Sequence, residues 1–247
     1  MKLKIDFLPE TTERHGTAFA GLDTPESFKR RLSTMPNDWH YRTKEISYIS
    51  NKLGFRTVEF DQVDWQNSVV LFGCSHVFGT GLAEDETLDY QLHKKFDRPV
   101  INMGCGGSSM LYSLYNQMAL HRVIKPLAVV NVWTQIDRLT VIAGDLPLNI
   151  NGFSQETYKT ELFRLWNLIN DRNSAKFSLL LQHTARLMWN DIPHVECTFF
   201  DSTASELTCE LFEYIDRARD VNHPGPNTIR LAADIISSKI ANNILSK

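Results

Sequence analysis

The sequence predicts an α/β fold in which helices cover both faces of a parallel sheet. From Asn67 onward, short apolar segments of strand length alternate with amphipathic segments of helix length. The apolar segments are almost uninterrupted, which is typical of strands that are buried on both faces. We therefore expect a three-layer, flavodoxin-like sandwich with a central parallel sheet, to which an N-terminal extension and a helical insert are added.

The first 66 residues differ from the rest of the chain. They are rich in polar residues and turn formers, as in Thr11–Gly16 and Met35–Asp38, and their one helical candidate is Ser27–Leu32. We expect residues 1–66 to form an extension that packs on a main domain of residues 67–247.

The main domain begins with strands and helices at short intervals. Runs of apolar residues predict the strands, and apolar residues at helical spacing predict the helices. In chain order these are a strand at Ser68–Phe72, a helix at Leu88–Phe96, a strand at Pro99–Asn102, a helix at Ser109–Arg122 and a strand at Leu127–Trp133.

An insert follows the third strand and begins with an expected turn at Gly144–Pro147. Pro226 and a capping Asn227 mark the start of the last helix. The elements after the turn are helices at Gln155–Asn170 and Ala175–Trp189, a strand at Val195–Phe200 and a closing helix at Asn227–Ile244.

Composition and charge exclude several classes of function. The 247 residues include 26 Lys and Arg against 29 Asp and Glu, so the formal charge of −3 creates no field that attracts nucleic acid. The first residues lack the apolar segment of a secretory signal, and no stretch has the length and apolarity of a membrane span. We expect a cytoplasmic protein that binds no nucleic acid and has no membrane span. The sequence favours no particular oligomeric state.

The four cysteines do not form a pattern that points to a metal or a redox function. They include no C-x-x-C pair and do not combine with histidines at metal-ligand spacing. We expect free thiols, no metal site and no cofactor at Cys74, Cys105, Cys197 and Cys209.

A serine at the end of the first predicted strand is the leading candidate for chemistry. Ser75 stands in a glycine-flanked turn that can direct its hydroxyl out of the edge of the sheet. Such a hydroxyl is a poor nucleophile near neutral pH and needs a base. Asp220 and His223, just before the closing helix, offer an imidazole and a carboxylate to orient it. Cys74 is an alternative nucleophile, although its use would shift this arrangement by one residue.

Four loops are expected to meet where this chemistry would occur. Loops at the carboxyl ends of parallel strands lie at one edge of the sheet. Ser75 follows one strand, Gly104–Gly107 another and Thr134–Asp137 a third, while Asp220–His223 approaches the last helix.

Together these segments resemble the SGNH, or GDSL-like, family of esterases and acyl hydrolases. Gly73-Cys74-Ser75-His76 is similar to the nucleophile block, with Cys74 in place of the usual acid, and Asp220-Val221-Asn222-His223-Pro224 is similar to the terminal D-x-x-H block. Asn102–Ser109 resembles the second block, and Asn51–Arg56 an N-x-x-G-F-R segment of some members. The resemblance covers about residues 45 to 240, without the insert between Thr140 and Phe177. It implies a catalytic Ser75, Asp220 and His223, with backbone N–H groups of Ser75 and Gly107 in an oxyanion hole.

One block departs from the family pattern. After the third strand the family has G-x-N-D, whose Asn completes the oxyanion hole, but here the chain reads Trp133-Thr134-Gln135-Ile136-Asp137-Arg138. The ungapped match places Ile136 at the Asn position. Gln135 is the expected replacement donor, with the hydroxyl of Thr134 as the alternative. Loss of one such donor typically lowers the rate by about 10²–10³, so a slower enzyme remains compatible with the pattern.

These observations lead to an expected function and two alternatives. The resemblance implies a serine hydrolase that cleaves a small or medium carboxylic ester through an acyl-enzyme on Ser75, with an O-acetyl group on a carbohydrate as one candidate substrate. A small-molecule or glycan ester is thus the expected partner. One alternative is a catalytically weakened SGNH-like domain that binds a glycan or a protein. The other is an O-acyltransferase, in which an acceptor hydroxyl replaces water.

Overall fold

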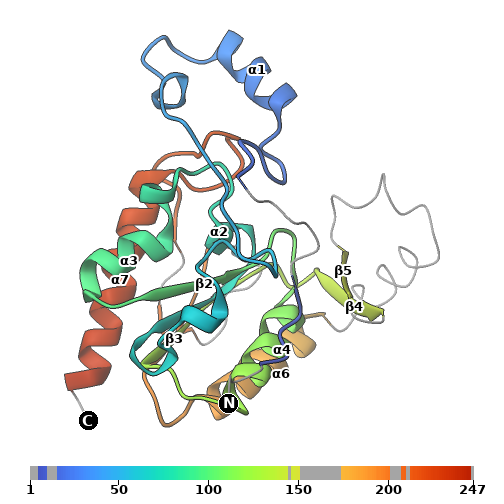
Figure 1. Ribbon diagram of the computed structural model, residues 1–247, viewed down its shortest axis with the longest axis vertical. Helices are drawn as coiled ribbons and strands as arrows, with labels where there is room; N and C mark the ends of the chain where they lie inside the picture. The colour runs from blue at the N-terminus through green and yellow to red at the C-terminus, as the bar shows by residue number, and fades with distance from the viewer. Residues whose placement is uncertain are drawn as a thin grey trace.

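The chain folds around a sheet of four parallel strands (Figure 1). The computed structural model describes residues 5–9, 16–143, 146–150, 174–200, 207–209 and 212–245. The strands lie in the order β2-β1-β3-β6, which is the order at the start of a flavodoxin-like sheet. The predicted fold class is therefore confirmed. The strands are β1 (Val69–Gly73), β2 (Val100–Gly104), β3 (Ala128–Trp133) and β6 (His194–Thr198).

Helices cover both faces of this sheet. Alternate residues of a strand point to opposite faces, so Val69 and Leu71 pack in one core cluster and Val70 and Phe72 in another. The first cluster includes residues of α3 (Leu88–Phe96) and α7 (Pro226–Leu245), which lie side by side. The second includes residues of α4 (Met110–His121), beside which lies α6 (Ser174–Met188). Figure 1 shows the two helix pairs on opposite sides of the sheet. Burial on both faces explains why the strands read as continuous apolar runs.

Shorter elements connect and flank this sandwich. Helix α1 begins after Thr24, whose hydroxyl accepts a hydrogen bond from the backbone N–H of Ser27 at 3.1 Å. Among the described residues no helix is long and apolar enough to span a bilayer. The remaining elements are α1 (Pro25–Thr34), α2 (Ser75–Phe78), the hairpin strands β4 (Leu139–Ala143) and β5 (Leu146–Ile150), and short 3₁₀ helices at His40–Arg42, Phe60–Gln62, Trp65–Asn67 and Glu84–Glu86.

The insert differs from its prediction. Leu146 and Pro147, expected in a turn, belong to β5, which pairs with β4 in an antiparallel hairpin. Proline is tolerated there because a two-stranded sheet consists only of edge strands. The helix predicted at Ala175–Trp189 is present as α6. The helix predicted at Gln155–Asn170 lies outside the described residues.

The start of the closing helix is also corrected. Helix α7 begins at Pro226, so Asn227 lies inside the helix rather than at its cap. The side chain of Asp216 performs the capping, since its two oxygens accept the backbone N–H groups of Asn227 and Thr228 at 3.0 and 2.9 Å. Capping residues are usually sought directly at the start of a helix. Asp216 lies ten residues before Pro226, so such a search does not find it.

The described part of residues 1–66, here called the N-terminal segment, contributes to the core of the sandwich. Phe7 and Leu8 are buried in the same cluster as Val70 and Phe72 of β1. The backbone N–H of Leu8 donates to the side chain of Asn116 on α4 at 2.7 Å. Residues far apart in the sequence are thus joined by both apolar contact and hydrogen bonding.

Candidate active site

A close approach of three backbone segments positions Ser75. Strand β1 ends at Gly73, and Ser75 is the first residue of α2, a single turn that ends at Gly79 in the left-handed region (φ 78°). A Cβ on Gly104 of β2 would lie only 2.3 Å from the backbone nitrogen of Phe78. Only glycine permits this contact. The turn that carries Ser75 therefore sits directly against the end of the sheet.

Ser75, His223 and Asp220 form one chain of hydrogen bonds. The Oγ of Ser75 lies 2.8 Å from Nε2 of His223, and Nδ1 of the same ring lies 2.6 Å from Oδ2 of Asp220. The geometry fits a serine hydroxyl that donates to Nε2 and a ring N–H that donates to the carboxylate. All three residues are buried, Ser75 being 8 % exposed. The structure thus brings together the three side chains that the motifs singled out.

The surroundings of Asp220 keep its carboxylate ionised. Burial acts to raise its pKa, but the hydrogen bond and charge of His223 and two backbone hydrogen bonds outweigh it, so the pKa lies below its usual value. The two backbone donors are the N–H groups of Asn222 and His223, each 3.2 Å from Oδ1. A charged Asp220 is what a catalytic imidazole needs to hold its tautomer.

The loop that carries Asp220 and His223 contains a strained residue. Val221 has φ 57°, in the left-handed region that a β-branched residue rarely adopts. Such a conformation costs about 1–3 kcal/mol and persists where the surrounding structure enforces it. Within the loop, the backbone N–H of Val221 donates to the backbone carbonyl of Ala218 at 2.9 Å, and the backbone N–H of Ala218 donates to the backbone carbonyl of His223 at 3.0 Å.

A cavity of about 290 Å³ opens at Ser75 and His223. Its size is near the lower end of the range for small-molecule sites. Gly21 and Leu22 of the N-terminal segment form part of its wall. The other lining residues that matter for the chemistry are His76, Gly107, Gln135, Arg138, Phe200 and Tyr214.

Gly107 and Gln135, which were expected to contribute to an oxyanion hole, both line the cavity, and Gly107 has φ 75°. The side-chain carbonyl of Gln135 accepts hydrogen bonds from Nε and one terminal nitrogen of Arg138 at 3.3 and 3.2 Å. Thr134 is buried and is not among the residues that line the cavity. Ile136 packs against the apolar cluster around Trp133, so the residue at this position supplies no side-chain donor.

Cys74 is placed differently from Ser75. Its side chain is 1 % exposed, and it is not among the residues that line the cavity. Burial acts to raise the pKa of the thiol, but the charge of Arg138 and hydrogen bonds from the His76 backbone and Thr134 lower it overall. The imidazole of His223 faces the oxygen of Ser75 instead, which counts against Cys74 as the nucleophile.

Sequence reasoning assigned no role to His76, Arg138 or Tyr214. Nε2 of His76 lies 2.5 Å from the hydroxyl of Tyr214, and its ring packs beside that of His223 at a centroid distance of 5.2 Å. Burial, followed by the charges of His223 and Arg138, holds the pKa of His76 well below its usual value. A neutral ring at this position avoids charge repulsion with a protonated His223. Only the position of His76 beside Ser75 gave a signal in the sequence.

Comparison with solved structures gives distant likenesses, whereas no family model and no curated protein matches the chain. One is a protein assigned to the G-D-S-L lipolytic family from Desulfitobacterium hafniense DCB-2, with 15% identity over 70% of this chain and 99% of that one and a TM-score of 0.37. Another is an acetyl xylan esterase from the rumen bacterium Butyrivibrio proteoclasticus, with 8% identity over 74% and 65% and a TM-score of 0.42. A carbohydrate acetylesterase family member from Sinorhizobium meliloti has 13% identity over 74% and 100% and a TM-score of 0.35.

These identities and TM-scores are low. The likeness therefore carries no argument about activity, which has to be argued from the geometry around Ser75.

Proposed function

We propose that the chain is a serine hydrolase that cleaves carboxylic esters through an acyl-enzyme on Ser75. The observation that carries the proposal is the hydrogen-bonded series of Ser75, His223 and Asp220, of which Ser75 and His223 line a cavity. A serine, a base within 2.8 Å of it and a carboxylate within 2.6 Å of the base are the arrangement that activates a hydroxyl for attack on an acyl carbon.

The proposed reaction has two stages. Oγ of Ser75 bonds to the ester carbonyl carbon while His223 takes the hydroxyl proton, and the imidazolium then passes this proton to the departing alcohol as the carbon–oxygen bond of the ester breaks. In the second stage His223 removes a proton from water, the water oxygen attacks the acyl-enzyme, and the acid is released as Ser75 regains its proton. We expect the oxyanion to accept hydrogen bonds from the backbone N–H groups of Ser75 and Gly107 and from the amide of Gln135.

The cavity supports a small or medium acyl group as substrate. Its volume of about 290 Å³ leaves little room for a long chain, and Phe200, Tyr214 and Leu22 provide aromatic and apolar surface. An O-acetyl group on a carbohydrate fits these limits and is our candidate. Turnover of 4-nitrophenyl acetate, butyrate and octanoate, beside that of an acetylated sugar, would rank the acyl lengths.

The assembled triad counts against a domain that only binds. A binding module has no use for a serine hydrogen-bonded to a buried imidazole that a buried carboxylate orients, whereas an acyl-transfer enzyme requires all three.

Labelling with a fluorophosphonate tests the proposal without knowledge of the substrate. We expect one covalent adduct, located on Ser75 by peptide mass spectrometry, and the Ser75→Ala variant should lose both the adduct and the hydrolysis of short-chain esters. Cys74→Ala is the matched control and should keep both, because the thiol does not line the cavity. An adduct on Cys74, or undiminished turnover by Ser75→Ala, would contradict the assignment.

A further inference from the structure

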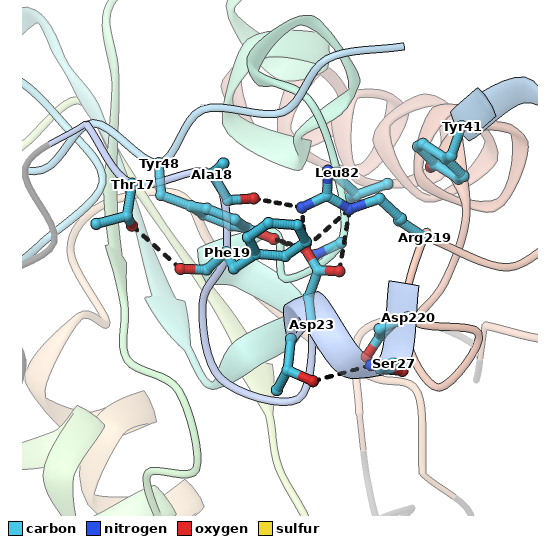
Figure 2. Close-up of polar contacts among 12 residues, drawn as sticks. Thr17, Ala18, Phe19, Asp23, Ser27, Tyr41, Tyr48, Leu82, Arg219 and Asp220 are labelled. Atoms are coloured by element: carbon cyan, nitrogen blue, oxygen red, sulfur yellow. Dashed lines mark hydrogen bonds and ion pairs between the residues drawn. The ribbon is translucent and has the colours of Figure 1, made fainter. Parts of the chain in front are cut away.

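A buried ion pair joins the N-terminal segment to the loop of the proposed triad (Figure 2). Nε of Arg219 donates to both oxygens of Asp23 at 3.0 and 3.1 Å, and a terminal nitrogen donates to Oδ2 at 2.6 Å. The same nitrogen also donates to the carbonyl of Ala18. Arg219 is 4 % exposed and Asp23 is 1 % exposed. Removal of one partner from such a pair leaves the other charge buried and uncompensated.

The ion pair is packed and hydrogen-bonded on its other sides as well. The guanidinium of Arg219 lies 4.6 Å from the ring centre of Phe19 and 5.0 Å from that of Phe28, both from the N-terminal segment. The hydroxyl of Tyr48 donates to Oδ2 of Asp23 at 2.7 Å. Arg219 and Asp23 are thus fixed in place by groups that precede Ser75 in the sequence.

The residues around this ion pair contact both the segment that follows the turn of Ser75 and the loop that carries Asp220 and His223. Arg219 is adjacent in sequence to Asp220, and its backbone N–H donates to the carbonyl of Gly81 at 3.0 Å. The backbone N–H of Gly81 donates to the hydroxyl of Tyr48 at 2.7 Å. Gly81 lies just beyond α2, the turn that begins with Ser75. The ion pair therefore sits where the nucleophile turn meets the loop of the base.

The loop that carries Asp220 and His223 (the loop of the base) contains a strained residue that this ion pair can hold in place. Val221, next to Asp220, occupies the left-handed region at φ 57°, so the loop has an intrinsic tendency to relax to another conformation. A relaxation of about 1 Å at His223 is enough to lower a catalytic rate by about 10²-fold.

Resting on the proposed function, we propose that Asp23 and Arg219 are positioning residues that hold Asp220 and His223 against Ser75. In this arrangement the N-terminal segment forms part of the active site. The turn that ends at Asp23 also supplies Gly21 and Leu22 to the cavity wall.

The test compares substitutions of Asp23 with a matched ion pair elsewhere. Asp23→Asn removes the charge at nearly constant shape, and Asp23→Glu keeps the charge. The control is Asp85→Asn, which breaks the exposed pair of Lys44 and Asp85 at 2.8 Å, a second link between the N-terminal segment and the main domain. We expect Asp23→Asn to lower kcat by about 10²-fold with little change in KM, Asp23→Glu to recover part of that loss, and Asp85→Asn to keep the parental kcat.

A spectroscopic measurement separates positioning from a general loss of folding. In the parent, the proton between Nδ1 of His223 and Asp220 should give a far-downfield ¹H NMR signal, assigned by its absence in His223→Gln. Asp23→Asn should shift or broaden this signal while its far-ultraviolet circular dichroism stays parental. A parental signal and a parental kcat in Asp23→Asn would overturn the proposal. If Asp23→Asn does not fold, the comparison is made with Arg219→Lys, for which the same outcomes apply.

Failure of the proposed function would look different. A parent without fluorophosphonate labelling at Ser75 would reject the hydrolase, whereas the NMR comparison of parent and Asp23→Asn would still decide whether Asp23 positions His223.

Discussion

The orientation of one side-chain amide determines what Gln135 can do in the cavity. Because its carbonyl oxygen accepts two hydrogen bonds from Arg138, the NH₂ group of the amide is the end left to interact with a bound ester. The stacking of the guanidinium of Arg138 over Phe200, at 5.7 Å from the ring centre, holds this pairing in place. Arg138 thus fixes which end of the amide faces the cavity.

At the residue scale we therefore predict that Gln135→Ala lowers kcat by about 10²-fold, the usual loss for one oxyanion donor. Labelling of Ser75 by a fluorophosphonate should remain detectable, because His223 activates the serine without this donor. Thr134→Ala is the control and should be mild, since Thr134 is not among the residues that line the cavity. Steady-state kinetics of both variants with one short-chain ester provide the measurement. Parental kcat in Gln135→Ala would assign the third contact to another group.

Residue types and their order were enough to predict which side chains would meet at Ser75. A hydroxyl after a buried strand and an Asp-x-x-His before the last helix lie at the same edge of a parallel sheet. The contributions of Arg138 and Tyr214 were not predictable in this way. Arg138 directly follows the loop expected at this edge, but the family pattern gives that position no role, and Tyr214 stands outside all the blocks, so its place at the cavity follows from packing between distant segments.

At the scale of elements, the junction of β1, β2 and α2 decides where the nucleophile stands. The backbone of α2 lies against Gly104 so closely that a methyl group there would lie 2.3 Å from Phe78 and 2.8 Å from Val77. Both contacts are with backbone atoms, which cannot turn aside as the end of a side chain can. An added Cβ therefore has to move the whole turn that carries Ser75.

We predict that Gly104→Ala lowers the rate of ester hydrolysis by about 10²-fold or more, because a displacement of about 1 Å separates Ser75 from His223. The rate of fluorophosphonate labelling should fall in parallel, since the substitution affects the nucleophile itself. Gly16→Ala serves as a control at a glycine with nothing within 4 Å of an added Cβ, although its positive φ of 67° also disfavours alanine. Labelling of Gly104→Ala at the parental rate would show that the turn tolerates the displacement.

The observed elements matched the predicted ones where a single physical signal in the sequence dominated. Helix α3 has the predicted bounds, because its apolar spacing and flanking residues agree. The hairpin of β4 and β5 was missed because Gly144 and Pro147 were interpreted as a single turn, whereas the apolar residues around them pair across the hairpin. Local turn signals do not reveal which flanking residues find a partner strand.

At the scale of the whole molecule, the N-terminal segment is tied to both the core and the proposed site. Phe7 is buried in the core cluster that includes Val70 and Phe72 of β1, and it also contacts the rings of Phe60 and Trp65 at centroid distances of 4.9 and 5.8 Å. Arg56 donates to the carbonyls of Gly79, at the end of the turn that carries Ser75, and of Leu82, just after it, at 2.9 and 3.1 Å. The sequence predicts that residues 1–66 pack on the main domain, but it does not predict which of their residues reach the core, because short apolar stretches between turns leave no periodic signal.

We predict that Phe7→Ala lowers the free energy of unfolding by about 3 kcal/mol, as expected for loss of a buried aromatic side chain. The midpoint of urea denaturation measures the change. Ile49→Ala is the control in the same segment and should change the free energy by less than about 0.5 kcal/mol, because Ile49 is 59 % exposed. An unchanged midpoint for Phe7→Ala would contradict a stabilising contact of Phe7 with the core of the sandwich.

The cap that Asp216 places on α7 has a consequence for heat inactivation. Asp216 accepts from the first N–H groups of the helix and, through its own backbone carbonyl, from Gly225, so the chain between them forms a closed loop that contains Asp220 and His223. Helix α7 also carries a large share of one core cluster. On this side the loop that carries Asp220 and His223 is therefore tied to the same cooperative unit as the core. Activity and tertiary structure should then disappear in a single thermal transition, with no warm, folded and inactive state between them.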